Sequence, residues 1–145
     1  MTLALRFSHI LAAALWMGSA LFWPGALRRA LSLGLPHASA ALTQARMGAR
    51  LDLGAGLATV GTGLLFASPL GGGPVRAGVL LGLGLALARL GLLFGMARPA
   101  LRGVGEAVAK GDALAATAAS RRLPAYAGSA HLLWLLALAA MVFPL

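Results

Sequence analysis

The sequence predicts an all-α fold: an antiparallel bundle of four membrane-spanning helices. Of its 145 residues, 60% are hydrophobic and only 10% are charged, whereas an average soluble domain carries about 25% charged residues. Four apolar runs are long enough to cross a bilayer, and most charges lie between them. The alternating hydropathy of a membrane β-barrel is absent from the sequence. We therefore expect residues 1–145 to form a single membrane domain.

The apolar runs define the expected elements. We expect helices over about 3–23, 51–68, 75–96 and 124–143, with a tight connection over 69–74 and basic loops over 24–50 and 97–123. Pro24 and Gly25 should end the first helix. The stretch from Ser39 to Arg50 has a helical composition with Ser39 as N-cap, so the second helix is expected to begin before the membrane. A short helix outside the membrane is also expected within residues 98–122.

Charge sets the expected orientation in the membrane. The net charge is +9, and nine of the twelve basic residues lie in the segments 24–50 and 97–123. The positive-inside rule places these segments in the cytoplasm and both termini in the periplasm of a bacterial inner membrane. The first run is too long for a signal-peptide core and lacks a clean cleavage context, so we expect it to remain as a helix.

Several function classes lack support in the sequence. The chain has no cysteine, which excludes disulfides, iron–sulfur clusters and thiol catalysis. A nucleophile–base pair, paired carboxylates and a phosphate-binding loop are also missing. Nucleic acid is not an expected partner, because no helix-turn-helix or paired Cys/His set is present. The expected partner is the lipid bilayer.

His9 is the first candidate ligand, because a histidine inside an apolar run is costly to bury unpaired. His9, Trp16 and Trp23 recur every seven residues and so share one face of the first helix. The same face carries small residues that would admit a helix or a flat ligand: Ala12, Ala13, Ser19 and Ala20. A neutral imidazole can ligate haem iron. The alternative is a hydrogen bond to a neighbouring helix.

His131 and Arg89 are the other embedded candidates. The expected depths of His9 and His131 in the membrane differ by one to two helical turns. One haem ligated by both histidines is therefore not favoured over two separate sites, or over one site with a single histidine ligand. His131 has the same alternative, a hydrogen bond within the bundle. Arg89 needs an ion pair with Asp52, an anionic ligand such as a haem propionate, or a water-filled cavity. Trp16 and Trp134 would pack on a ring or on each other, and His37 is expected in a solvated loop.

Small residues predict which helix faces point inward. Asp52, Gly56, Thr59 and Gly63 share one face of the second helix, and Gly78, Gly82, Ala86 and Arg89 share one face of the third. Gly84 with Ala88 and Gly91 with Gly95 are further small pairs, and the pairs Gly78/Gly82 and Gly91/Gly95 cannot all face the same neighbour. The surplus allows a homo-oligomer or a place in a larger membrane complex.

The first helix also resembles known proteins. Its run from His9 to Gly18, with Trp16-Met17-Gly18 seven residues after the histidine, is similar to helix 1 of the copper-resistance D family and of the HemJ-type protoporphyrinogen oxidases. The segment Arg98-Pro99-Ala100-Leu101-Arg102 and the close at Ala140–Pro144 resemble a related family of integral membrane proteins without an assigned function. The intramembrane lysine of the oxidases has no counterpart, and Met/His copper clusters are lacking.

The resemblance implies haem b, with His9 as the ligand on the first helix. Together with the embedded position of His131, this makes His9 and His131 the expected metal ligands, and the embedded Arg89 and Trp16 are the further expected cofactor-binding residues. The implied function is electron transfer or tetrapyrrole oxidation in the membrane. The alternative is a non-enzymatic accessory or scaffold subunit, and the residues do not decide whether the chain is an enzyme.

Overall fold

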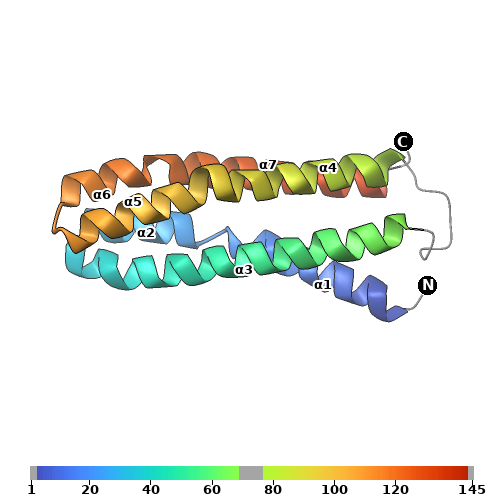
Figure 1. Ribbon diagram of the computed structural model, residues 1–145, viewed down its shortest axis with the longest axis horizontal. Coiled ribbons are helices and arrows are strands. Elements are labelled where there is room, and N and C mark those ends of the chain that lie inside the picture. The colour runs from blue at the N-terminus through green and yellow to red at the C-terminus, as the bar shows by residue number, and fades with distance from the viewer. Residues whose placement is uncertain (1–2, 69–76, 144–145) are drawn as a thin grey trace.

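The computed structural model describes residues 3–68 and 77–143, which form four antiparallel helical rods (Figure 1). The first rod is α1 (Leu3–Ser19) and α2 (Trp23–Ser32), and the second is α3 (Leu35–Ala67). The third is α4 (Ala77–Leu92), the π-helical turn η2 (Leu93–Ala97) and α5 (Arg98–Ala109). The fourth is α6 (Ala113–Ala119), the 3-10 turn η3 (Ser120–Arg122) and α7 (Leu123–Val142). The described residues contain no strand, so the predicted all-α fold is confirmed.

The rods are longer than predicted, because the two basic segments are helical and not loops. Segment 24–50 forms α2 and the first half of α3, and segment 97–123 forms α5, α6 and η3. Each buries an apolar face at helical spacing, as Leu27 and Leu31 do in α2, while the arginines occupy the opposite face. The tight turns lie at the far ends, at Gly34 (φ 108°) and Gly111 (φ 72°), in conformations that favour glycine.

Two expected helix boundaries were wrong. The first helix ends at Ser19 instead of Trp23, because the ring of Pro24 would clash with the preceding turn. Pro24 instead occupies the first turn of α2, where its missing N–H costs nothing. Ser39 is not an N-cap: α3 begins at Leu35, and the Ser39 hydroxyl donates to the Pro36 carbonyl. The expected connection over 69–74 lies outside the described residues.

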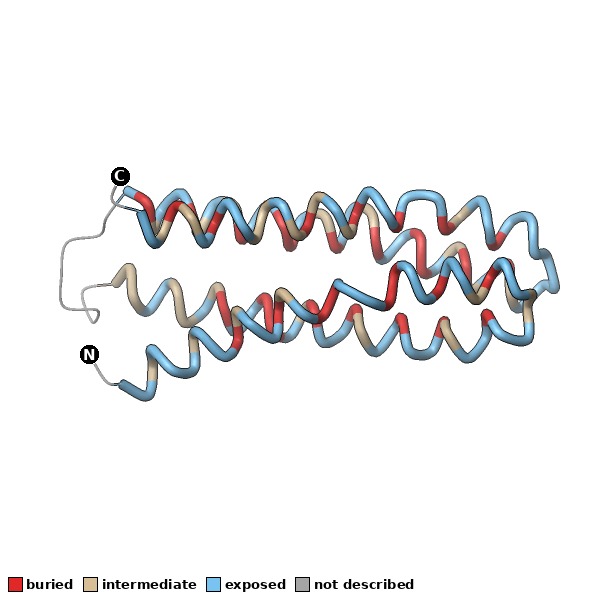
Figure 2. Tube along the Cα trace, turned by 180° about the vertical axis from the view of Figure 1, so that it is seen from behind, coloured by how far each residue is buried: buried red, intermediate tan, exposed pale blue. Residues whose placement is uncertain are grey.

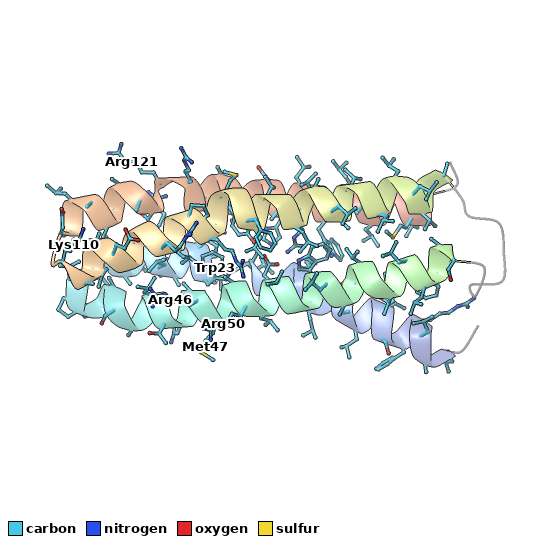
Figure 3. The ribbon with its side chains drawn as sticks, viewed as in Figure 1. Trp23, Arg46, Met47, Arg50, Lys110 and Arg121 are labelled. Carbon is cyan, nitrogen blue, oxygen red and sulfur yellow. The ribbon has the colours of Figure 1, made fainter. Side chains whose placement is uncertain are left out.

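The bundle has two chemically different halves. In the half where α1 begins and α7 ends, large apolar side chains are exposed: Phe7, Ile10, Leu57, Leu80, Leu81, Leu87, Leu132, Leu135 and Leu136. In the other half the exposed positions include nine basic residues, and Figure 3 shows Arg46, Arg50, Lys110 and Arg121 there. We call these the apolar half and the basic half.

Three of the described helical segments are long and apolar enough to cross a membrane: Leu3–Ser32, Ala77–Ala109 and Ala113–Val142. The fourth predicted span, in α3, is not among them. That stretch combines the charges of Arg50 and Asp52 with Thr59, Thr62 and several glycines, which lower its hydropathy. Much of this polar content faces inward, since Asp52 and Thr59 are buried.

Packing follows the small faces that the sequence predicts. Helix α1 packs mainly on α3, and α4 mainly on α7. The inward faces are red in Figure 2 and include Gly56 of α3 and Gly82 of α4. A Cβ at Gly82 would lie 2.8 Å from Met141 Cγ, whereas one at Gly84 would meet nothing within 4 Å. A side chain at position 82 would therefore press on Met141, so the glycine allows the close contact between α4 and α7.

Gly56→Ala should destabilise the bundle. A Cβ there would lie 2.8 Å from both Leu90 Cδ2 and Trp16 Cε2, so the core would have to shift. We expect a loss of about 1–3 kcal/mol in the free energy of unfolding. Gly61→Ala, in the same helix but with nothing within 4 Å, should be neutral or stabilising, since alanine favours helix. Thermal unfolding in detergent compares the two; equal melting temperatures would contradict the close contact.

Candidate functional site

All four rods meet at the buried carboxylate of Asp52, which belongs to α3 and is 1% exposed. Its Oδ1 accepts hydrogen bonds from Arg89 Nη2 of α4 at 3.0 Å and from Ser19 Oγ of α1 at 2.8 Å. Its Oδ2 accepts a hydrogen bond from the Tyr126 hydroxyl of α7. Of the three roles considered for Arg89, the structure shows the ion pair with Asp52. The paired charges and hydrogen bonds offset the cost of burying a carboxylate.

Arg89 also completes the end of α1. Its Nη2 donates to the Trp16 carbonyl at 2.7 Å, and Ser19 Oγ lies 2.7 Å from the same oxygen. This carbonyl lies in the last turn of α1, where helix carbonyls lack intrahelical partners. The guanidinium carbon lies 4.4 Å from the Trp16 ring centroid, a cation–π contact. Arg89 thereby links the break in the first rod to α3 and α4.

A groove in the apolar half runs beside His9. Its volume is about 400 Å³, and it lies between α1 and α7, with α3 and α4 beneath. The lining is mostly apolar and includes His9, Trp16, Trp134, Met17 and Met141. Because the lining residue Ile10 is 66% exposed, the groove opens to the surroundings of the bundle. Its size is typical of a small-molecule or cofactor site.

His9 is hydrogen-bonded to Thr62 of α3, which is the alternative role that the sequence analysis named for it. Its Nδ1 lies 2.7 Å from Thr62 Oγ1, and that hydroxyl donates to the Ala58 carbonyl at 2.7 Å. When the single Thr62 proton is donated to Ala58, the Thr62 oxygen accepts from His9 Nδ1–H. The His9 ring also meets Phe66 edge-on, with 5.2 Å between centroids. In that tautomer the Nε2 lone pair is available, as in a metal-ligating histidine oriented by a second residue.

His131 does not line this groove. Trp134 Nε1 donates to the Ala13 carbonyl at 3.1 Å, which sets Trp134 level with Ala13. Because α1 and α7 are antiparallel, His9 and His131 lie on opposite sides of that level, roughly 10 Å apart along the bundle. Nδ1 of His131 donates to the Ala127 carbonyl of its own helix at 2.6 Å. The structure therefore does not bring the two histidines together.

The other predicted site residues divide between the two sites. Trp16 belongs to both: one part of its ring lies against Arg89 and it also lines the groove. Arg89 is engaged by Asp52 and does not line the groove. His37 is exposed as expected, although it lies in the first turn of α3 and not in a loop. Among the described residues, no group of three or more His, Asp or Glu side chains could hold a metal ion.

The sequence analysis missed two partners, Tyr126 and Thr62. Tyr126 is the only tyrosine of the chain and stands near the start of the last apolar run, a position where its hydroxyl needs a buried acceptor. Thr62 lies ten residues after Asp52 on the inward side of α3, one turn from Thr59. The sequence showed the apolar run in which each residue lies, but it did not show which residue of another rod each one contacts.

Comparison of the chain with protein-family models, with curated proteins and with solved structures gave no match. The family resemblance of the first helix therefore stays a prediction.

Proposed function

We propose that the apolar half of this bundle lies in a bacterial inner membrane. From its outer end to the Asp52 layer, each rod contributes about one apolar helix: α1 has 17 residues and α4 has 16. Such helices are about 25 Å long, close to the roughly 30 Å hydrocarbon core of a bilayer. The exposed leucines and phenylalanines of this half support the placement. The Asp52–Arg89 pair then lies near one membrane surface.

The basic half extends into the cytoplasm and the termini face the periplasm, in accord with the positive-inside rule. The helices of the basic half have a core of their own, in which apolar side chains from all of them pack against one another. This group includes Leu27, Leu42, Leu101 and Val104. The protein is thus a membrane bundle that continues as a cytoplasmic four-helix extension.

Cysteine labelling tests this placement cleanly, because the chain has no cysteine of its own. A membrane-impermeant maleimide should label Phe143→Cys in intact spheroplasts. It should label Ala115→Cys only after the membrane is permeabilised, and Leu87→Cys should resist labelling in both states. All three positions are exposed on the protein surface, so differences in labelling between them reflect protection by the membrane. Labelling of Ala115→Cys in intact spheroplasts would contradict the orientation, and labelling of Leu87→Cys would contradict the embedding.

Within the membrane, the function that the geometry supports best is binding of haem b in the groove beside His9. The bound haem would serve electron transfer or tetrapyrrole oxidation. The carrying observation is that His9 lines a groove with two tryptophans while its Nδ1 is hydrogen-bonded to Thr62. The porphyrin supplies four nitrogens to its iron, so a single histidine suffices as protein ligand. Haem would bring one-electron redox chemistry to the site.

The residues present fit this cofactor. His9 would ligate the iron, the Thr62 hydroxyl would hold the imidazole in the required tautomer, and Trp16 and Trp134 would pack against an aromatic ring. Exclusion of water by the apolar lining would favour a buried redox centre. Titration of purified wild-type protein with haemin should produce a saturable Soret band at one haem per chain. Failure to produce any band above that of free haemin in the same detergent would contradict the assignment.

An accessory or scaffold role is the second candidate function. Its support is a small-residue face on the third rod: Gly84, Ala88, Gly91 and Gly95 are all exposed, and a Cβ added at any of the three glycines would meet nothing within 4 Å. Such faces let helices of another membrane chain, or of a second copy, approach closely. Co-purification of a stoichiometric membrane partner with a colourless protein would favour this role over haem binding.

A further inference from the structure

Four arginines gather in a second groove, just beyond the Asp52 layer in the basic half. The groove has a volume of about 360 Å³ and lies between α3 and the third rod. Its lining consists of Arg46, Ala49, Arg50, Phe94, Arg98, Leu101 and Arg102. No acidic side chain belongs to this lining. The labelled Arg46 and Arg50 mark the position of the groove along α3 (Figure 3).

The groove is assembled by two local features of the helices. The π turn η2 carries Phe94, and the Arg98 guanidinium carbon lies 4.5 Å from its ring centroid. Such turns interrupt a helix at a cost and occur frequently at functional sites. Opposite them, the Arg46 guanidinium lies where a Cβ of Gly105 would be. The glycine thus lets Arg46 reach across from α3 to α5.

The charges of this groove are not neutralised by protein. Among residues 3–68 and 77–143, the only salt bridge is that between Arg89 and Asp52. All four groove arginines are exposed and free to contact a ligand. Like charges repel one another at this spacing, so an anion with several oxygens would relieve the repulsion. Planar guanidinium groups match phosphate oxygens with paired hydrogen bonds.

The location of the groove points to the source of the phosphate. The lining residue Arg50 stands two residues before Asp52, and the lining also includes the exposed apolar side chain of Phe94, so the groove sits where the apolar half gives way to the basic half. We propose that it binds the phosphate headgroup of an anionic membrane lipid, with the acyl chains along the apolar half. This inference rests on the membrane placement proposed above but not on haem binding. Basic pockets at the cytoplasmic ends of membrane helices bind such headgroups.

Native mass spectrometry of the detergent-solubilised full chain tests the site. Wild-type protein should retain added cardiolipin and lose added phosphatidylcholine under the same activation energy. Arg50→Gln/Arg98→Gln should weaken cardiolipin retention by about tenfold or more. Arg121→Gln/Arg122→Gln removes the same charge from exposed positions outside the groove and should leave retention unchanged. Gly105→Val, which removes no charge but displaces Arg46, should also weaken retention.

Three outcomes would overturn the proposal. If the two double variants lost cardiolipin retention to the same extent, the lipid would be attracted by the net charge of the protein and not bound at a specific site. If cardiolipin retention were unchanged in Arg50→Gln/Arg98→Gln protein that still fractionates with membranes, the groove would not be the lipid site. The membrane placement would not be affected by that result. Displacement of cardiolipin by equimolar inorganic phosphate would assign the groove to a free phosphate compound and not to a lipid.

Discussion

Asp52→Asn is expected to lower the free energy of unfolding by about 3–5 kcal/mol, because it leaves a buried charge without its partner. Arg89 is 1% exposed and makes its only salt bridge to Asp52, among the described residues. Ser19 and Tyr126 also lose part of their acceptor, and all four rods contribute to this cluster. Equilibrium unfolding in detergent, followed by tryptophan fluorescence, measures the loss.

Two variants make this result specific. Glu106→Gln removes one negative charge from an exposed position and should change stability by no more than about 0.5 kcal/mol. Asp52→Leu/Arg89→Met removes both buried charges and should recover most of the lost stability. If Asp52→Asn were as mild as Glu106→Gln, the buried ion pair would not hold the rods together as described.

His9→Ala is the variant with the largest expected effect on function. It removes the only imidazole among the residues that line the apolar groove, so the Soret band of the haem-loaded protein should be lost or strongly weakened. Thr62→Val should keep the imidazole but release its orientation, weakening haem affinity by about 10–100-fold. Absorbance titrations with haemin give both results.

The matched controls come from the other histidines and from another threonine of α3. His37→Ala alters an exposed residue and should leave the spectrum unchanged. His131→Ala should also retain the band, since His131 lies roughly two turns from His9 and outside the groove. Thr43→Val removes an exposed hydroxyl bonded only within its own helix and should not alter affinity. A full and unshifted band in His9→Ala would reject His9 as the ligand.

Helix faces were predictable from the sequence because small and polar residues recur at helical spacing. The inward face of α3 with Asp52, Gly56 and Thr59 is confirmed, as is the face of α4 with Gly82 and Arg89. Periodicity also identified Arg89 and Asp52 as the two embedded charges in need of partners. Their ion pair was one of three predicted roles for Arg89, since no other acidic residue lay near an apolar run, and the structure shows that pair.

The lengths of the rods were not predictable by the same reasoning. Charge density in segments 24–50 and 97–123 was interpreted as loop, although each segment buries an apolar stripe that includes Ala38, Leu42, Leu101 and Val104. That error placed Asp52 at the start of a helix, whereas it lies in the middle of α3.

Partners on different rods escaped prediction for another reason. The contact of Tyr126 with Asp52, and that of Thr62 with His9, depend on the relative level and rotation of two helices. Periodicity within one helix does not set either quantity. The same holds for the arginine groove, whose residues come from α3, η2 and α5.

Binding of haem b in the groove beside His9 is the function that we propose for this bundle. Its most direct test is the absorption spectrum of the wild-type chain purified from membranes in mild detergent, recorded as isolated and after reduction by dithionite. We predict a Soret band as isolated, with sharper bands at longer wavelength on reduction, in proportion to the protein present. A protein that is colourless as isolated and stays colourless after haemin is added and the excess removed would contradict the claim.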